Sequence, residues 1–276
     1  MTMMSPNAPP QAARYALATG ARAAGRLDVL HRVYASGSLQ ALLEAGLAYG
    51  MAVADFGCGT GNVTRLLATR VGSAGRVTGI DLHPDQLRQA RELCAGLTNV
   101  CFLAADACHT ELDRNTFDLV YCRFLLLHLS NAAACLREMR RVLKPGGILV
   151  VEDGNLESAA SVPATALDVF AELFGRLGPV RGVDYSIGDR LCHLVVDAGF
   201  SEIGMKVHQP ADRAGASGLL LKWSVQEAGP AFIEAGLITP DQLAQTLSDM
   251  DIALSNPDVL AIAPRMYSVW GRKLMS

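Results

Sequence analysis

The chain has 276 residues, of which 24 are Lys or Arg and 27 are Asp or Glu, and half are hydrophobic. This length allows one large domain or two small ones with a well-buried core, and the apolar content excludes a chain that is disordered as a whole. The formal net charge of −3 lacks the excess positive charge typical of proteins that bind nucleic acid, so no nucleic-acid partner is expected.

The sequence predicts a cytoplasmic protein that does not cross a membrane. No stretch approaches the roughly 20 consecutive apolar residues of a membrane-spanning helix. The N-terminal residues lack the charged and apolar regions of a secretory signal. The seven cysteines are odd in number and form no C-x-x-C pair, which favours reduced, buried thiols. Cys101, Cys108 and His109 match no zinc-ligand spacing, so no metal is expected there.

Before residue 50 the sequence predicts helices rather than strands. Residues 1–11, which are rich in Pro and Asn, are expected to form a disordered tail. Apolar residues at helical spacing predict a helix within residues 12–34. Ser38 is expected to cap a second helix, because a hydroxyl at that position can accept a hydrogen bond from the first turn.

From residue 51 short apolar runs alternate with amphipathic stretches. The predicted strands are 51–56, 76–80, 100–103, 117–122 and 148–152, with helices between them. Ser130 is expected to cap the helix before the fifth strand. Strands that alternate with helices in this way predict right-handed βαβ units and a parallel sheet.

After residue 155 the alternation loosens. Helices are predicted over residues 163–178, from Ser186 and from Pro240 onward, and strands over residues 202–208 and 265–272. The stretch between these two strands then contains a helical insertion over residues 212–258. No composition change marks a linker that would separate a second domain.

The strongest local motif is VADFGCGTGN, which begins at residue 53. It places a carboxylate, Asp55, near the end of a predicted strand and puts Gly57, Gly59 and Gly61 before a helix. Ligands of parallel sheets bind at the carboxyl ends of the strands, and glycines allow the backbone to approach them closely. A dinucleotide-binding loop has its third Gly where this chain has Asn62, and a carboxylate would repel two phosphates. The loop therefore favours a cationic ligand over NAD.

DFGCGTG resembles the first motif of class I S-adenosylmethionine-dependent methyltransferases, and four later segments match this family in order. These segments are 79–82, 105–107, 117–122 and 143–149. The resemblance is strong over residues 50–153 and weak elsewhere. It implies an α/β, Rossmann-like fold: a seven-stranded, mostly parallel sheet with helices on both faces, N-terminal helices and a helical insertion before the last strand.

With this fold the sequence predicts a single methyltransferase domain over residues 12–276. It would consist of an N-terminal helical cap (12–49), a cofactor-binding core (50–153), and substrate-side helices with the final strands (154–276). The resemblance implies S-adenosylmethionine as the cofactor and S-adenosylhomocysteine as the product.

The resemblance also implies roles for the acidic residues that follow the second and third strands. Asp81 would accept hydrogen bonds from both ribose hydroxyls, which one carboxylate can do. Asp106 would accept from the adenine amine, with the Ala107 N–H on the ring. Leu82 would pack beside the ribose and the adenine. The alternatives are a helix N-terminal charge at Asp81 and an ordinary loop residue at Asp106.

The remaining implied cofactor contacts come from the glycine loop and the fourth strand. Gly57 and Gly59 would pack against the methionine portion, and Asp55 would interact with its amino group. The other residues assigned to the cofactor are Thr60 and Gly61 at the helix start and Cys122 and Arg123 at the end of the fourth strand.

Two residues are candidates for the reaction itself. His128 titrates near neutrality when unperturbed, so it could act as a base for an acidic or amine acceptor. A histidine with a structural role beside the Ser130 cap is an equal alternative. Arg123 would bind the cofactor carboxylate or an acidic substrate, or else lie solvated at the rim. Tyr15, Arg26 and Leu27 resemble part of a cofactor-covering helix in some small-molecule members, and an ordinary amphipathic helix explains them at least as well.

Several acceptor classes are disfavoured. The segment after the fourth strand, from Tyr121 to Phe124, contains neither the Asn/Asp-Pro-Pro-aromatic run of DNA amino-methylating enzymes nor the Pro-Cys of cytosine C5 enzymes. Arg123 occupies a place where a metal-dependent enzyme would need a carboxylate. Glu152, Asp153 and Asn155 offer oxygen ligands, yet no metal cofactor is expected.

The sequence thus predicts an enzyme that methylates O, N, S or C of a small organic acceptor, such as a specialised metabolite. One alternative is a protein that binds the cofactor in a regulatory or scaffold role without transferring the methyl group. A nicotinamide-dependent oxidoreductase is disfavoured by Asp55 and Asn62. The apolar segments 156–190 and 212–258 fit a lid over the acceptor, and packing or a homodimer contact explains them too.

Overall fold

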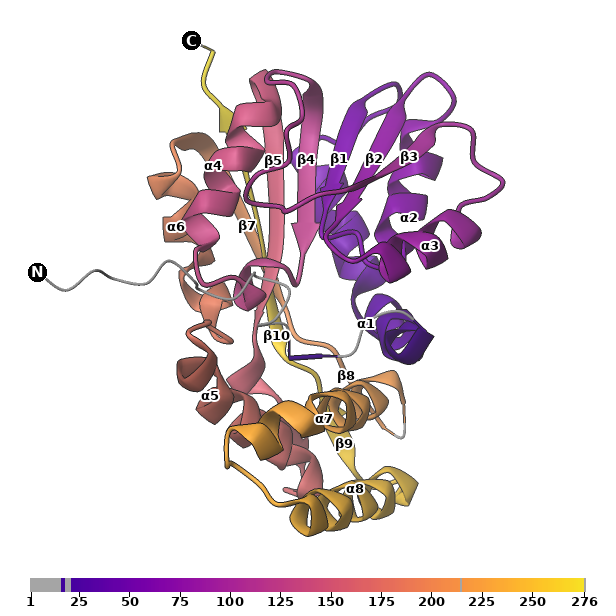
Figure 1. The fold of residues 1–276 in the computed structure, drawn as a ribbon, viewed down its shortest axis with the longest axis vertical. Coiled ribbons are helices and arrows are strands. Elements are labelled where there is room, and N and C mark those ends of the chain that lie inside the picture. The colour runs from indigo at the N-terminus through magenta and orange to yellow at the C-terminus, as the bar shows by residue number, and fades with distance from the viewer. Residues whose placement is uncertain (1–15, 18–20, 214, 276) are drawn as a thin grey trace, which may run out of the picture.

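The computed structural model describes residues 16–17, 21–213 and 215–275, and a seven-stranded sheet forms its centre (Figure 1). The strand order is β3-β2-β1-β4-β5-β10-β7. The strands are β1 Ala52–Phe56, β2 Arg76–Asp81, β3 Val100–Ala104, β4 Phe117–Arg123, β5 Leu143–Asn155, β7 Phe200–His208 and β10 Arg265–Lys273. Neighbouring strands pair in parallel except at β10, which is antiparallel to β5 and β7. This confirms the predicted mostly parallel sheet.

Strand β1 lies at the point where the strand order reverses. Its five residues are all buried, because elements cover both faces of the sheet. The first strand after it in the chain, β2, lies on one side, and β4 lies on the other. Ligands of such sheets bind outside the carboxyl ends at this reversal, which is where the glycine loop follows Phe56.

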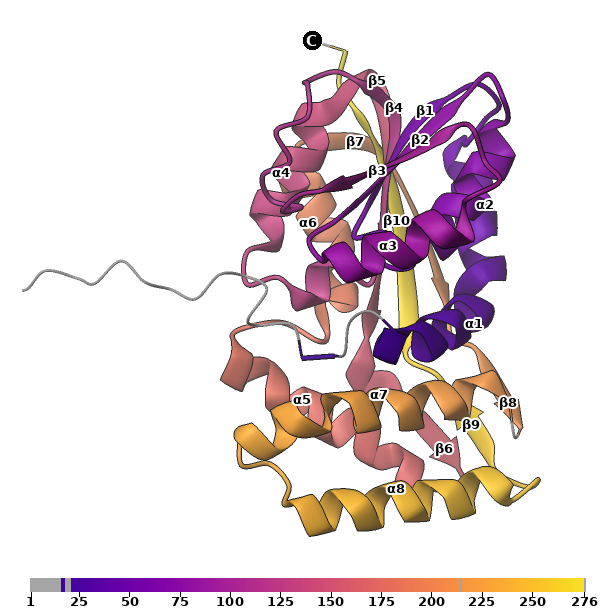
Figure 2. The same cartoon turned by 45° about the vertical axis from the view of Figure 1, so that its right-hand side comes forward.

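Helices cover both faces of the sheet, as predicted. Figure 2 shows α1 and α2 on one face and α4 and α6 on the other. The helices are α1 Ala21–Ala45, α2 Asn62–Val71, α3 Pro84–Leu93, α4 Ala132–Val142, α5 Val169–Arg181, α6 Leu191–Asp197, α7 Ala216–Glu234 and α8 Pro240–Ser255. Among the described residues, we find no helix with the length and apolar character of a membrane span.

A second layer lies below the carboxyl ends of the parallel strands (Figure 1). It contains α5, α7, α8 and a small antiparallel sheet, in the order β6-β9-β8. The strands of this sheet are β6 Ala160–Val162, β8 Ala211–Arg213 and β9 Leu260–Ile262. The predicted helical insertion between the last two strands is confirmed as α7 and α8. The three-residue strands are too short to show an alternating pattern in the sequence, so they were not predicted.

The central sheet and the lower layer share one buried apolar cluster. It includes Val151 of β5, Phe174 of α5, Phe232 of α7 and Met250 of α8. The rings of Phe174 and Phe232 are 5.2 Å apart in a T-shaped arrangement. The single domain over residues 12–276 stays a prediction, which this shared cluster supports. The predicted tail, residues 1–11, lies outside the described residues.

The N-terminal region differs from the prediction of two helices. One helix, α1, runs through Ser38, so Ser38 lies inside a helix and does not cap the start of one. Its hydroxyl instead accepts a hydrogen bond from Nη1 of Arg123 at 3.1 Å. Because a hydroxyl bonds as readily to a distant side chain as to a nearby N–H, the sequence alone could not distinguish these roles.

Three other element boundaries also differ. Asn131, not Ser130, caps α4, and its side chain accepts from the Ala134 N–H at 3.0 Å. Helix α5 begins at Val169, later than residue 163, after a short 3-10 turn over Ala166–Asp168. Strand β5 starts at residue 143 rather than 148, because the Lys-Pro-Gly-Gly segment already lies in the sheet.

Candidate functional site

The glycine loop between β1 and α2 requires glycine at two positions for different reasons. Gly57 has φ +68°, and a Cβ there would come within 2.9 Å of Cδ1 of Leu125. Gly61 has φ +84°, and a Cβ there would come within 2.9 Å of Cβ of Ala90 in α3. A left-handed backbone costs other L-residues about 1–2 kcal/mol. Gly57 therefore keeps the loop open toward Leu125, whereas Gly61 allows α2 and α3 to pack together.

Asp81 connects the end of β2 to the glycine loop. One carboxylate oxygen accepts from the Gly59 N–H and the other from the His83 N–H, each at 2.9 Å. Burial raises the pKa of Asp81 above its usual value, and these backbone hydrogen bonds act in the opposite direction. Since each carboxylate oxygen has two lone pairs, both can accept a further hydrogen bond from a ligand.

Asp55, near the end of β1, is 2% exposed. Thr64 of α2 donates a hydrogen bond to its Oδ2 at 2.6 Å. Burial raises the pKa of Asp55 to about 7, although the Thr64 hydrogen bond and the nearby Arg123 favour the charged form. A cationic ligand beside this carboxyl group would stabilise its ionised form.

A central cavity opens at the carboxyl ends of β1, β2 and β3. It brings together eight of the residues predicted for the site: Gly57, Gly59, Asp81, Leu82, Asp106, Ala107, Arg123 and His128. A neighbouring hollow, with which it shares Gly57, Gly59 and Arg123, adds Asp55 and Thr60. Segments far apart in the sequence thus form one site, in the place that the motif order predicts.

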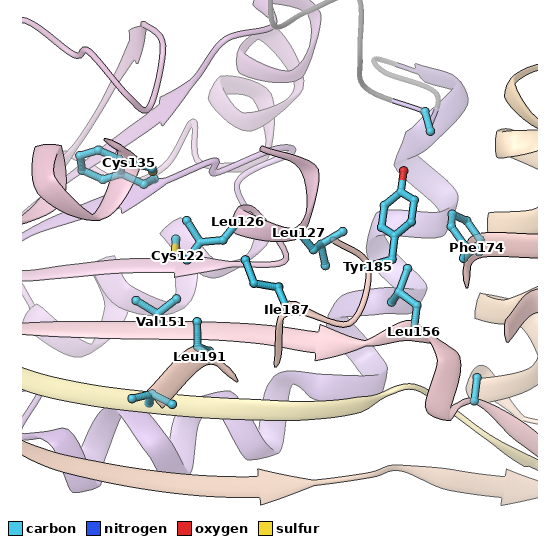
Figure 3. Packing of buried hydrophobic residues seen from close by; sticks show 14 of the residues in the cluster. Cys122, Leu126, Leu127, Cys135, Val151, Leu156, Phe174, Tyr185, Ile187 and Leu191 are labelled. Atoms are coloured by element: carbon cyan, nitrogen blue, oxygen red, sulfur yellow. The ribbon is translucent and has the colours of Figure 1, made fainter. Parts of the chain in front are cut away.

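Two predicted cofactor residues line neither hollow. Gly61 packs against α3, as described above. Cys122 is fully buried and lies with Leu126, Val151 and Leu191 in the apolar core (Figure 3). Successive side chains of a strand point to opposite faces, so Cys122 faces away from the side that Tyr121 and Arg123 face. Burial raises the pKa of its thiol well above the usual value. We therefore leave Gly61 and the side chain of Cys122 out of the candidate cofactor site.

Arg123 lies between the central cavity and α1. Its guanidinium donates to Ser38 and lies 3.4 Å from Nδ1 of His31. Burial and the charge of Arg123 together lower the pKa of His31 to about 4. His31 is therefore neutral near pH 7 and adds no second positive charge beside Arg123.

His128 lies in the 3-10 turn Leu126–His128, after β4, and lines the central cavity. Its ring is 5.9 Å from that of Tyr185, in a T-shaped arrangement. Burial, with a smaller effect of Arg26, lowers the pKa of His128 to about 3. A histidine with this pKa is neutral near pH 7 and is a weak base, which favours a role in shaping the cavity over proton abstraction.

The sequence left open whether the N-terminal helix covers a ligand or is an ordinary amphipathic helix. In the structure, Arg26, Leu27 and Leu30 of α1 form one wall of the central cavity; Tyr15 lies outside the described residues. Gln86 of α3 is 3% exposed, and its Oε1 has no hydrogen-bond partner among the described residues. Such a buried acceptor beside Asp81 is suited to a ligand donor. No spacing rule in the sequence singles out Gln86 from other helical glutamines.

Phe124 also lines this cavity, and its backbone has φ +50°. A non-glycine residue in this conformation is uncommon and carries strain. The strained residue directly follows Arg123, at the end of β4, and so turns the chain toward His128. The sequence contains no glycine or asparagine here that would have indicated such a turn.

The oxygen atoms near the end of β5 that the sequence offered as metal ligands bind other protein groups. Glu152 accepts hydrogen bonds from the hydroxyls of Tyr121 and Ser268. One oxygen of Asp153 accepts from the Leu126 N–H at 2.8 Å, and Asn155 donates to Asp189. Within the described ranges, no group of three His, Cys, Asp or Glu side chains has the arrangement of a metal site.

A larger hollow, with a volume of about 740 Å³, lies away from this site. Its walls include Arg114, Arg137, Arg140 and Lys273, next to the start of β4 and the end of β10. It contains none of the predicted site residues. Because ligands of parallel sheets bind at the carboxyl ends of the strands, the smaller central cavity is the candidate active site.

Residues 53–147 match a family described as a methyltransferase domain. A demethylmenaquinone methyltransferase of Staphylococcus aureus is 35% identical over 139 residues, which are 50% of this chain and 56% of the relative. The chain thus spans about half the length of the curated relatives that it matches.

Solved structures share the fold at low sequence identity. A candidate methyltransferase from Bacillus halodurans has TM-score 0.58 and 21% identity, over 86% of this chain and 98% of that one. A phosphoethanolamine N-methyltransferase of Haemonchus contortus, in complex with S-adenosylhomocysteine, has TM-score 0.53 and 17% identity. This match covers 91% of this chain and 52% of that one. The [4+2]-cyclase SpnF has TM-score 0.52 and 20% identity, over 86% of this chain and 79% of that one.

The family match covers the glycine loop and the acidic residues after β2 and β3, and the similar structures share the sheet around them. The sequence motifs, the strand order and the position of the cavity therefore agree with one another. Residues 53–147 thus match a methyltransferase-domain family, and the fold around them is the one that the similar structures share.

Proposed function

We propose that this protein is an S-adenosylmethionine-dependent methyltransferase that acts on a small organic molecule. The observation that carries the proposal is that the central cavity joins the glycine loop to Asp81 and to Asp106 and Ala107. These groups follow three adjacent parallel strands, at the edge where such sheets bind ligands.

The chemistry of the cavity fits the different parts of the cofactor. Asp81, with two further lone pairs, would hold the ribose hydroxyls, and Asp106 with Ala107 would hold the adenine. Asp55 supplies negative charge near a ligand that carries an ammonium and a sulfonium group, and Gly57 and Gly59 let the backbone approach. The buried Oε1 of Gln86 is an additional acceptor for a ligand N–H or O–H.

When bound, S-adenosylmethionine supplies an electrophilic methyl group on a positively charged sulfur. The residues around it have little covalent chemistry to perform, so orientation and charge dominate their contribution. Arg123 and the apolar side chains of α1 would exclude water from the cavity and orient the two reactants. His128, neutral near pH 7, contributes shape and hydrogen bonding.

A small acceptor is supported by the lower layer, in which α5 and α7 lie below the sheet (Figure 2). Side chains of these two helices line a second hollow that shares residues with the central cavity. The relatives named above as demethylmenaquinone methyltransferases support a small organic acceptor as well. The free state of all seven cysteines supports the predicted cytoplasmic location. The absence of a nucleic-acid partner and a homodimeric state remain predictions from the sequence.

Calorimetric titration of S-adenosylmethionine tests the cofactor assignment. We expect saturable binding to the wild-type protein and about 10- to 100-fold weaker binding to Asp81→Asn, because one or two hydrogen bonds to a charged acceptor are weakened. Asp118→Asn is the matched control, because Asp118 also accepts from a backbone N–H, that of Ala52 at 2.8 Å, and lies at the opposite end of the sheet. Equal affinity of wild-type and Asp81→Asn protein would refute the assignment.

Transfer of the methyl group requires its own test, because the same fold also serves a cyclase and fold alone does not determine the reaction. We expect the protein, incubated with cofactor labelled at the methyl group and a metabolite extract, to move label into a small molecule. Binding without any label transfer would favour a regulatory or scaffold role.

A further inference from the structure

A second, mostly apolar cavity adjoins the central cavity; we refer to it as the lower cavity. Leu156, Phe170, Phe174 and Leu220 are among its apolar wall residues. Figure 3 shows Leu156 and Phe174 close to Tyr185, and the rings of Phe174 and Tyr185 are 5.3 Å apart. The lower cavity itself has a volume of about 40 Å³, and its apolar walls suit a small apolar group of a ligand that also reaches the central cavity.

Four residues line both cavities: Arg26, Leu30, Phe124 and His128. The lower cavity therefore begins where the central cavity ends, beside the turn that follows β4. A molecule in the lower cavity would have one end next to the ligand of the central cavity. This is the arrangement that transfer between two bound molecules requires.

Arg26 is the cationic group at this junction. Its side chain is 4% exposed, and its Nε donates to Oε2 of Glu227 in α7 at 2.7 Å. The Nη2 of Arg26 is buried and has no hydrogen-bond partner among the described residues. A buried donor without a partner is costly, and more so when it is charged. Such a group is explained if a ligand oxygen accepts from it.

Among the described residues, the other polar groups at the lower cavity do not provide a base. His128 is neutral near pH 7 because burial lowers its pKa, and Ser224 is a hydroxyl that is 6% exposed. The described walls thus offer an acceptor no strong base to remove its proton. An acceptor that is already ionised needs none, and the guanidinium of Arg26 stabilises its charge.

We propose that the lower cavity binds the methyl acceptor, and that this acceptor is an apolar molecule with one ionised oxygen that accepts a hydrogen bond from Nη2 of Arg26. The proposal rests on the proposed function, since it assigns the second substrate of the same site. The ionised oxygen would belong to a carboxylate or to a phenolate, and both sources share this chemistry. Glu227 positions the guanidinium through Nε and leaves Nη2 for the ligand.

Calorimetry with matched probes tests the proposal in the wild-type protein saturated with S-adenosylhomocysteine. The probes are 4-propylbenzoate against 4-propylbenzamide, and 4-nitrophenolate against 4-nitroanisole, at a pH where both acids are ionised. We expect at least one anion to bind about 10- to 100-fold more tightly than its neutral counterpart. The pair that shows the preference identifies carboxylate or phenolate as the source. Equal binding within both pairs, or no binding of any probe, would overturn the proposal.

Two substitutions separate ligand binding from a purely structural ion pair. Arg26→Gln should remove the preference for the anion, whereas Glu227→Gln should increase it, because the charge of Arg26 is then no longer balanced. If the ion pair were purely structural, both substitutions would change the preference for the anionic probe in the same direction. That result would also contradict the proposal. Asp251→Asn is the control, since Asp251 pairs with Lys222 on the exposed side of the same layer.

The outcomes also distinguish this proposal from the proposed function. Failure of S-adenosylmethionine and S-adenosylhomocysteine to bind would overturn the proposed function. Normal cofactor binding combined with equal binding of anionic and neutral probes would overturn only the acceptor assignment. Circular dichroism of each variant establishes that it is folded, and the wild-type comparison of probes holds even if Arg26→Gln does not fold.

Discussion

Asp55 is a buried carboxyl group whose protonation should control cofactor binding. Its pKa is raised to about 7 by burial, and a cationic ligand binds the ionised form. Below about pH 7 binding must displace a proton, so affinity for S-adenosylmethionine should fall by up to about tenfold per pH unit. Calorimetry over this range measures the slope. Asp55→Asn should bind more weakly and lose the part of the slope that Asp55 causes, and an unchanged slope would contradict this role.

His128 should stay neutral to a pH well below the usual range of histidine. Burial and the charge of Arg26 lower its pKa to about 3. In proton NMR titrations, the His128 resonance, assigned by its loss in His128→Asn, should not shift between about pH 5 and pH 8, where exposed histidines titrate. Arg26→Gln should raise the pKa of His128. Titration of His128 near pH 6.5 would restore it as a candidate base.

At the scale of single residues, the sequence singled out Asp55, Asp81, Asp106, Gly57 and Gly59, which line the two hollows, because each belongs to a local motif. It also assigned Cys122 to the cofactor, and the structure places that side chain in the core. The face that a residue occupies at the end of a strand depends on the register of the strand, which a motif alone does not establish. Gln86 was missed because its significance arises only from its burial beside Asp81.

The packing of α2 against α3 provides a test at the scale of elements. Gly61→Ala combines a left-handed backbone with a Cβ 2.9 Å from Cβ of Ala90, so we expect a loss of about 2–5 kcal/mol in the free energy of unfolding. Gly236→Ala is the matched control, since Gly236 has φ +67° with no atom near the added Cβ. It should cost only about 1–2 kcal/mol. Urea unfolding measures both, and equal losses would contradict a packing role for Gly61.

The helices and strands were predicted well where their hydrophobic pattern extends over enough residues to be recognised. The five parallel strands and the helices between them follow from the alternation of apolar runs, which is a local property. The predicted N-terminal caps were wrong, both Ser38 for a second helix and Ser130 for α4. Residue type alone does not distinguish Ser38, Ser130 and Asn131, because all three are able to accept a backbone hydrogen bond. Which of them does so depends on the path of the chain, as the bond between Ser38 and Arg123 shows.

For the whole molecule, buried acids should make stability fall as the pH rises. Asp153 is fully buried, and burial raises its pKa to about 8 from the usual 3.8. The folded protein then holds this proton more tightly than the unfolded chain does. The resulting stabilisation of the folded state is fully present below about pH 4 and is lost as the pH rises through about 8. Asp55 acts in the same direction up to about pH 7.

Asp153→Asn tests this effect, because the amide oxygen can still accept from the Leu126 N–H and carries no charge. Urea unfolding measures the free energy of unfolding of both proteins. The difference between variant and wild type should favour the variant more at pH 9 than at pH 5.5. Asp118→Asn should show no such gain, because the pKa of Asp118, which pairs with Lys144, is lowered rather than raised. Parallel stability curves for wild-type and Asp153→Asn protein would contradict the buried titration.

The sequence by itself determined the alternation of strands and helices, the glycine loop and the acids at the strand ends. Each of these is encoded within a few residues, by hydrophobic period, backbone conformation or residue type. Only the tertiary structure decided how α1 and α7 meet the sheet and form the lower cavity. Arg26 and Glu227 are 201 positions apart, so no local pattern can show that they form a partly buried ion pair beside the central cavity.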